Sequence, residues 1–296
     1  MPAAKPIVKW AGGKSRLLRD LLHRVPTKMR TFAEPFAGGA ALFFAVASSE
    51  GLTFKRALLA DQNAELLACY RAVRDDVDGV IVALGAYHYD RDLFYETRKK
   101  STAKLSDVDR AARFIFLNRT CFNGLWRVNA SGKFNVPFGR YKNPRILDVD
   151  GLRAASAALR GVEIVQKDFA EVTRKLGKND FVYLDPPYAP VSKTAAFTAY
   201  ASGGFGPADQ RRLVDELRGL RRRGAMAMVS NADTPETREL YREFACEVVA
   251  VSRPINSDAT KRGDAAELIV TSWGSPGISR RSLEGVAHRA TYARPS

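Results

Sequence analysis

Short apolar runs alternate with amphipathic segments along most of the chain, and this alternation predicts an α/β fold. The expected helices lie at 40–48, 151–159 and 207–223, with a short one after Thr234. The expected buried strands begin at Thr31, Arg56, Val162, Phe181 and Ala225, and two more lie near 247–251 and 267–272. Such an open, mostly parallel sheet binds ligands at the carboxyl ends of its strands.

A different pattern fills the middle of the chain. Residues 63–117 carry helical spacing, broken by polar stretches near 75–79 and 99–109. In the following segment, 118–142, two apolar stretches flank Asn129-Ala130-Ser131-Gly132, which is typical of a hairpin turn. We therefore expect a helical insertion that ends in a β-hairpin. From Gly274 onward the chain lacks a pattern, which predicts an unstructured basic tail.

The strongest candidate for chemistry is the stretch Phe181-Val182-Tyr183-Leu184-Asp185-Pro186-Pro187-Tyr188. The two prolines fix a turn at the end of an apolar strand and hold Asp185 extended. If Asp185 and the Pro186 carbonyl accept the hydrogens of an exocyclic amine, and Tyr188 stacks on its ring, the nitrogen lone pair turns toward an electrophile. The alternative is a proline-rich turn that only ends a core strand.

Two segments near the N-terminus place aromatic, glycine and charged residues where a small ligand would bind. Trp10 and Lys14 flank Ala11, Gly12 and Gly13, although Val8 stands where a P-loop needs glycine. Phe36 and Gly38 belong to a strand, glycine turn and helix, the nucleotide-binding half-unit of a Rossmann-like sheet.

Acidic residues end two further strands of the predicted sheet. Asp61 ends the second strand, at the place where such folds bind ribose hydroxyls. Asp168 and Phe169 follow a later strand. Their side chains either bracket an adenine ring or, in the simpler alternative, Asp168 only caps the helix that begins near Phe169.

Charge and cysteine content narrow the class of partner. The formal net charge of +15 favours a polyanion. Six Lys or Arg and no acid lie between Asn118 and Leu147, so the hairpin suits phosphates and base edges, unless it is an ordinary solvated hairpin. The three cysteines are far apart, which argues against disulfides and a zinc site. No apolar run is long enough to span a membrane, so we expect a cytoplasmic protein that binds neither a metal nor a membrane.

In their order along the chain, these motifs resemble the Dam family of DNA adenine-N6 methyltransferases. The match continues through Ser230–Thr234 and Arg253–Ser257 and covers nearly the whole chain except the tail. It implies a Rossmann-like, S-adenosylmethionine-dependent methyltransferase sheet in two parts, 1–66 and 161–274. A DNA target-recognition domain of helices and a β-hairpin, 67–160, would separate them, and 275–296 would form the tail.

The resemblance also implies residue roles. Asp185, Pro186 and Tyr188 would be catalytic, acting on an adenine flipped out of the duplex. The cofactor S-adenosylmethionine would contact Trp10, Lys14, Phe36 and Gly38 with its methionine part, Asp61 with its ribose, and Asp168 and Phe169 with its adenine.

Sequence choice would fall to the hairpin. In the family, the arginine that matches Arg127 reads a guanine of GATC, the residues that match Leu125 and Pro137 pack beside it, and the lysine that matches Lys9 contacts the first guanine. Further DNA contacts are expected from Arg119, Asn123, Asn135, Arg140, Tyr141 and Lys142. The expected enzyme is a monomer on double-stranded DNA, nucleoid-associated through it, with a restriction endonuclease for the same site as a candidate partner.

Two alternatives stay open on the sequence alone. The same chemistry could act on RNA or a protein amide, although loop RNA is usually read by stacked aromatic platforms. The other alternative is a non-enzymatic DNA-binding regulator on a methyltransferase scaffold. The intact cofactor and catalytic motifs argue against it.

Overall fold

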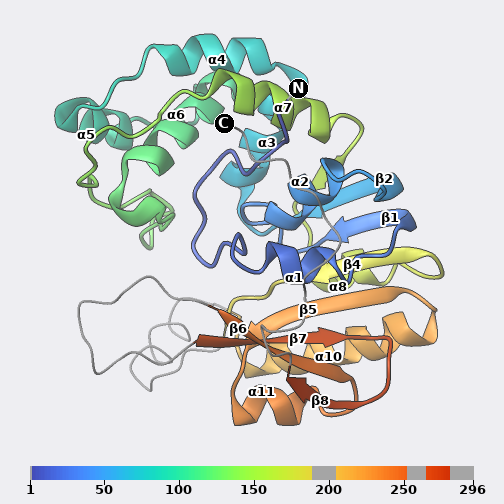
Figure 1. The fold of residues 1–296 in the computed structure, drawn as a ribbon. Helices are drawn as coiled ribbons and strands as arrows, with labels where there is room; N and C mark the ends of the chain where they lie inside the picture. Colours follow the sequence, from blue (N-terminus) through green and yellow to red (C-terminus); the bar gives the residue numbers. More distant parts are fainter. Residues whose placement is uncertain (1, 189–204, 252–264, 281–296) are drawn as a thin grey trace.

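The computed structural model describes residues 2–188, 205–251 and 265–280, and the segment Arg253–Ser257 lies outside them. Its centre is an eight-stranded sheet in the order β3-β2-β1-β4-β5-β7-β6-β8 (Figure 1). The strands are β1 (Lys28–Glu34), β2 (Thr53–Ala60), β3 (Glu163–Val165), β4 (Asp180–Leu184), β5 (Met226–Ala232), β6 (Ala245–Val251), β7 (Ala265–Thr271) and β8 (Gly277–Arg280). The first five pair in parallel, whereas β7 runs antiparallel to β5 and β6.

Apolar packing covers both faces of the central strands. On β4, Phe181 and Tyr183 face one hydrophobic cluster, and Val182 and Leu184 face the other. All of β4 is buried, as expected for a parallel strand covered on two sides. The α/β fold predicted from the sequence is therefore confirmed.

Helices lie beside the sheet and in the segment between β2 and β3. They are α1 (Leu18–Leu22), α2 (Ala41–Ala47), α3 (Ala64–Asp75), α4 (Val77–Gly85), α5 (Arg91–Lys99), α6 (Asp107–Thr120), the 3-10 turn η1 (Phe122–Gly124), α7 (Val149–Leu159), α8 (Phe169–Thr173), α10 (Pro207–Arg222) and α11 (Pro235–Leu240). Within the described ranges, none of them is long and apolar enough to cross a membrane.

Helices α3 to α6 form the predicted helical insertion, grouped at the end of the molecule opposite β8 and α11 (Figure 1). The helical region has a third break, at residues 86–90 between α4 and α5, in addition to the two polar breaks that the sequence predicts. Aromatic packing fastens the insertion together: Phe94 lies 5.3 Å from Phe138 and 6.3 Å from Phe116, measured between ring centroids. These rings belong to the same hydrophobic cluster as Phe181, so the insertion shares a core with the sheet.

The hairpin after α6 is less regular than the sequence predicts. Its turn forms as expected, since the Gly132 N–H donates to the Asn129 carbonyl at 2.9 Å. In place of two strands, however, the described chain has two isolated bridge pairs, Cys121 with Phe138 and Val128 with Phe134. Trp126 explains the irregularity, because its ring packs 3.9 Å from that of Phe114 on α6 and draws the first arm onto the helix.

The prediction of an unstructured tail from Gly274 is wrong at its start. Gly277–Arg280 forms β8, which pairs in parallel with β6. Four residues give too short a pattern to distinguish from a loop, and their order comes from pairing with an existing sheet edge.

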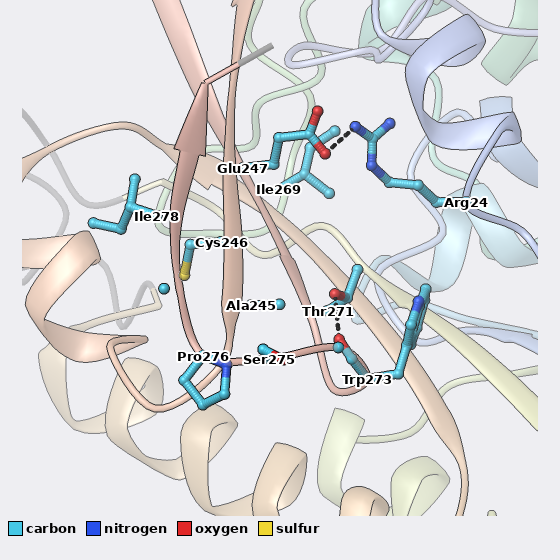
Figure 2. A pocket seen from close by; sticks show the side chains of 12 residues that line it. Arg24, Ala245, Cys246, Glu247, Ile269, Thr271, Trp273, Ser275, Pro276 and Ile278 are labelled. Carbon is cyan, nitrogen blue, oxygen red and sulfur yellow. Dashed lines mark hydrogen bonds and ion pairs between the residues drawn. The ribbon is translucent and has the colours of Figure 1, made fainter.

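A cavity of 470 Å³ lies between Arg24 and strands β6 to β8 (Figure 2). Arg24 forms an ion pair with Glu247 on β6, and the Trp273 ring lies 6.3 Å from that of Phe181, near the start of β4. The cavity is thus at the amino ends of the parallel strands. Burial raises the pKa of the Cys246 thiol in its wall to about 11, which leaves the thiol protonated and unreactive.

Asn118, near the end of α6, joins the N-terminal loop to the hairpin. Its buried side chain accepts from the Lys9 N–H at 2.7 Å and donates to the Lys9 carbonyl at 2.7 Å and the Gly124 carbonyl at 3.1 Å. The approach is close enough that a Cβ on Gly124 would lie 2.4 Å from that of Lys9. One amide group therefore satisfies three backbone groups of two distant segments.

Asn118→Ala should lower the free energy of unfolding by roughly 1 to 3 kcal/mol, because it leaves buried backbone groups without partners. Urea unfolding followed by circular dichroism measures the change. Asn143→Ala, at an exposed asparagine, is the matched control and should shift stability by less than about 0.5 kcal/mol. Equal stabilities of the two variants would contradict the role given to Asn118.

Candidate active site

A cavity of 1030 Å³ lies at the carboxyl ends of β1, β2 and β4. Its lining brings together all of the catalytic and cofactor-binding residues predicted from the sequence: Trp10, Lys14, Phe36, Gly38, Asp61, Asp168, Phe169, Asp185, Pro186 and Tyr188. These residues come from five separate stretches of the chain, and the parallel strand order places them at one edge of the sheet. The described residues contain no cluster of three or more His, Cys, Asp or Glu that could hold a metal ion.

Asp185 follows directly after β4 and carries the central charge of this cavity. Its Oδ1 accepts from Lys14 Nζ at 2.8 Å and from the Ser230 hydroxyl at 2.9 Å. Burial raises the pKa of Asp185 to about 6, although both donors act in the opposite direction. The carboxylate is therefore ionised at neutral pH but close to titration.

Lys14 contacts both the carboxylate of Asp185 and the aromatic ring of Tyr188. Only 6% of its side chain is exposed, and its ammonium also donates to the Gly12 carbonyl at 2.9 Å. It lies 4.7 Å from the centre of the Tyr188 ring. The Tyr188 hydroxyl donates to Glu267 on β7 at 2.6 Å, and burial beside Asp185 and Glu267 raises its pKa, so the ring stays a neutral phenol.

Sequence reasoning missed several residues around Asp185. Glu34 at the end of β1 is buried, and burial next to Asp185 raises its pKa well above the usual range. Ser230 on β5 binds Asp185, and Glu267 holds Tyr188. A charged residue closing an apolar strand, as in Phe32-Ala33-Glu34, was a usable signal. Ser230 begins one segment of the family resemblance, but that match gave it no role. Glu267 has no local signal, because only the strand order β4-β5-β7 brings it to Tyr188.

The glycine turn after β1 fits close around its neighbours. Gly38 has φ 46°, and a Cβ there would lie 2.7 Å from the Trp10 indole. Its N–H donates to Asp61 at 2.9 Å, and its carbonyl accepts from the Tyr70 hydroxyl at 2.6 Å. Asp61 also accepts from the Asn63 N–H, and burial raises its pKa. Asp61 thus caps the strand end while still facing the cavity.

Three aromatic rings form one wall of the cavity. The Phe36 and Phe169 rings stack with centroids 5.4 Å apart, and Phe205 meets Phe36 edge-on at 5.5 Å. Asp168 caps α8 by accepting from the Ala170 N–H at 2.9 Å. It also pairs with Arg212 at 2.8 Å and lines the cavity, so capping does not remove it from the site.

The predicted DNA-binding residues divide into exposed and supporting groups. The exposed ones are Asn123, Leu125, Arg127, Pro137, Arg140 and Lys142. Arg127 donates through Nε to the Asn135 side chain at 2.9 Å, which orients its guanidinium. Two apolar side chains that the sequence did not single out, Phe122 and Val128, are each 48% exposed on the same segment.

Lys9, Arg119 and Tyr141 make contacts within the protein. Lys9 Nζ lies 4.0 Å from the centre of the Tyr141 ring, whose hydroxyl donates to the Cys121 carbonyl at 2.9 Å. Arg119 donates twice to the Ile7 carbonyl, at 3.2 and 2.7 Å. Burial lowers the pKa of both Lys9 and Arg119. In this arrangement Arg119 and Tyr141 support the N-terminal loop and the hairpin.

Comparison with known proteins agrees with the site. Residues 10–255 match the D12 class N6 adenine-specific DNA methyltransferase family. The Type II methyltransferase M1.LlaDCHI of Lactococcus lactis subsp. cremoris is 39% identical over 279 residues, 92% of this chain and 96% of that protein. M.MjaIII, a Type II methyltransferase of Methanocaldococcus jannaschii, is 38% identical over 91% of this chain and 99% of its own.

A third relative is the DNA adenine methylase of Escherichia coli (strain K12), 34% identical over 273 residues, 91% of this chain and 95% of that protein. The family match extends from Trp10 in the cavity, through the insertion and the hairpin, to beyond β6. The chain therefore belongs to the D12 class of N6 adenine-specific DNA methyltransferases and is an enzyme that methylates adenine in DNA.

Proposed function

We propose that this enzyme transfers a methyl group from S-adenosylmethionine to the exocyclic amino nitrogen of an adenine flipped out of duplex DNA, within the sequence GATC. The observation that carries the proposal is the position of Asp185, a half-buried carboxylate fixed between a strand end and a proline, beside the Tyr188 ring. A stacked and paired adenine cannot present its amine to such a group, so the base has to leave the helix.

Asp185 and the Pro186 carbonyl are the acceptors for the two amino hydrogens. An acceptor pair at this place makes the nitrogen more tetrahedral and frees its lone pair for attack. Tyr188 stacks on the base. Its ring is held in place, because Glu267 binds its hydroxyl and Lys14 lies against its ring. The residues thus act by positioning and electrostatics.

The cavity lining fits S-adenosylmethionine, which, when bound, supplies a methyl group activated by its positive sulfur. The cavity volume of 1030 Å³ suffices for a nucleoside with an amino-acid chain. Trp10, Lys14, Phe36 and Gly38 would hold the methionine part. Asp61 has acceptor capacity left for ribose hydroxyls, and Phe169 with Asp168 lies at the side suited to the adenine.

The exposed side of the hairpin is the proposed DNA-reading surface. Arg127 is exposed and oriented by Asn135, and its forked guanidinium suits guanine O6 and N7. Leu125 and Pro137 are exposed on the same segment, and Lys9 lies close to it at Tyr141. Arg140 and Lys142 would contact phosphates. A restriction endonuclease acting on the same site stays a prediction that accompanies the GATC assignment.

Asp185→Asn should reduce methyl transfer by about 10²- to 10³-fold, the effect typical of removing one preorganised group at a reacting centre. Cofactor affinity should change much less than the transfer rate, because Asp185 is assigned to the acceptor amine and the amide has nearly the same shape. Single-turnover transfer of labelled methyl and calorimetric titration of S-adenosylmethionine separate the two effects. Asp215→Asn, at an exposed carboxylate on α10, is the control. Transfer by Asp185→Asn within a fewfold of the parent would remove Asp185 from catalysis.

The rate of methyl transfer should fall at acid pH with a midpoint of about 6, because burial raises the pKa of Asp185 to that value. Above pH 6 the carboxylate is ionised and accepts from the amine. Below it, Asp185 is protonated, and the acceptor is lost. The measurement is the single-turnover rate from pH 4.5 to 8.5 at saturating DNA and cofactor, and a midpoint near the ordinary aspartate value would contradict it.

Arg127→Ala should cost about 1 to 3 kcal/mol of discrimination at one base pair of the site, because a bidentate contact to guanine is lost. The matched variant Arg140→Ala should weaken all DNA alike and flatten the salt dependence of binding, as expected for a phosphate contact. Mapping methylated adenines in DNA exposed to each enzyme tests both, and modification centred on another motif in the parent enzyme would reject GATC.

A further inference from the structure

The carboxylate of Asp185 is held by a chain of hydroxyl groups that reaches into the core of the sheet. Ser230 Oγ on β5 lies 2.9 Å from Asp185 Oδ1 and 2.8 Å from the hydroxyl of Tyr183 on β4. Ser230 is fully buried, and Tyr183 is 1% exposed. Bulk water therefore does not reach either hydroxyl.

The direction of these bonds follows from counting hydrogens. An ionised Asp185 can only accept, so the single hydroxyl hydrogen of Ser230 points to it. The Tyr183 hydroxyl must then donate to Ser230. Burial and the nearby Asp185 charge raise the pKa of Tyr183 well above its usual range, so the phenol keeps that hydrogen throughout the working pH range.

The strand pairing fixes the chain in place. Leu184 on β4 pairs with Val229 on β5, so Asp185 and Ser230, the next residue on each strand, lie side by side. Ser230 and Lys14 both bind Oδ1. A carboxylate has about four lone-pair sites, so acceptor capacity remains for an amine.

We propose that Ser230, oriented by Tyr183, is a positioning residue that keeps Asp185 ionised and correctly aimed for the acceptor amine. This inference rests on the catalytic role proposed for Asp185.

The charged surroundings of Asp185 explain why it needs such a partner. Among the described residues, Lys14 from the N-terminal loop is the cation that faces it, whereas Glu34 on β1 and Glu267 on β7 are nearby carboxyl groups. Tyr183 and Tyr188 add two phenols. Burial and Glu267 raise the pKa of Asp185, and the Ser230 hydroxyl is one of the groups that lower it. Loss of that hydroxyl should therefore raise the pKa.

The test is the pH profile of single-turnover methyl transfer, at saturating DNA and S-adenosylmethionine. Ser230→Ala should move the acid midpoint upward by about one pH unit, the equivalent of one hydrogen bond to a charged group. The rate near neutral pH should fall while KM for DNA stays unchanged. Tyr183→Phe, which removes one oxygen from a buried ring, should shift the midpoint in the same direction by less, and Ser230→Thr should restore it.

Ser272→Ala is the matched control for loss of a buried hydroxyl. Ser272 accepts from the Ala227 N–H at 2.9 Å and donates to the Ala225 carbonyl at 3.3 Å, at the other end of β5. It should cost stability without moving the midpoint. If Ser230→Ala fails to fold, Tyr183→Phe still decides the question.

Unshifted midpoints in both Ser230→Ala and Tyr183→Phe would overturn the inference, and so would an equal shift in Ser272→Ala. If Asp185→Asn is inactive at the same time, only the role of Ser230 fails. If Asp185→Asn keeps its activity, the failure lies in the catalytic role of Asp185 itself.

Discussion

The arrangement of the whole site depends on one ion pair, in which the buried ammonium of Lys14 meets the half-buried carboxylate of Asp185. An isolated charge is costly in the interior, so the Lys14 ammonium, with 6% of its side chain exposed, has to meet a partner there. Asp185 is that partner, and 21% of its side chain is exposed to the cavity. The N-terminal loop must therefore close over the carboxyl ends of β1 and β4. This closure brings Trp10 against Gly38 and completes the cavity wall.

The same loop links the cavity to the hairpin that we propose reads DNA. Behind Lys14, Asn118 binds the backbone of Lys9, and Arg119 binds that of Ile7. A row of aromatic rings follows the same path: Trp10 contacts Phe114, then Trp126 and Phe134 of the hairpin, at centroid distances of 6.5, 3.9 and 4.5 Å. The hairpin is therefore joined to the Trp10 side of the cavity through a continuous packed core.

The sequence predicted features that depend on local chemistry and missed those that depend on pairing between distant strands. The turn at Asp185-Pro186 and the acid at Asp61 could be predicted because a strand end, prolines and glycines are local signals. The contacts of Ser230 and Glu267 could not, since they follow from the strand order β4-β5-β7, with β7 antiparallel to β5, and this order has no local signature. The hairpin arms lost their ladder because Trp126 packs on α6, an interaction between segments that periodicity does not describe.

The large cavity and the hairpin carry opposite charges. Among the described residues that line the large cavity, six are acidic, Glu34, Asp61, Asp168, Glu171, Asp185 and Asp209, and two are lysines, Lys14 and Lys167. The segment from Asn118 to Leu147 has six basic residues and no acid. A phosphate backbone is thus attracted to the hairpin and repelled from the cavity. The acidic lining of the cavity instead favours a cationic sulfonium and admits a neutral base. On the proposed function, this difference in charge keeps the DNA backbone outside the cavity while one base enters. Lys14 does not reverse the negative charge of the cavity, because its own charge is paired with that of Asp185.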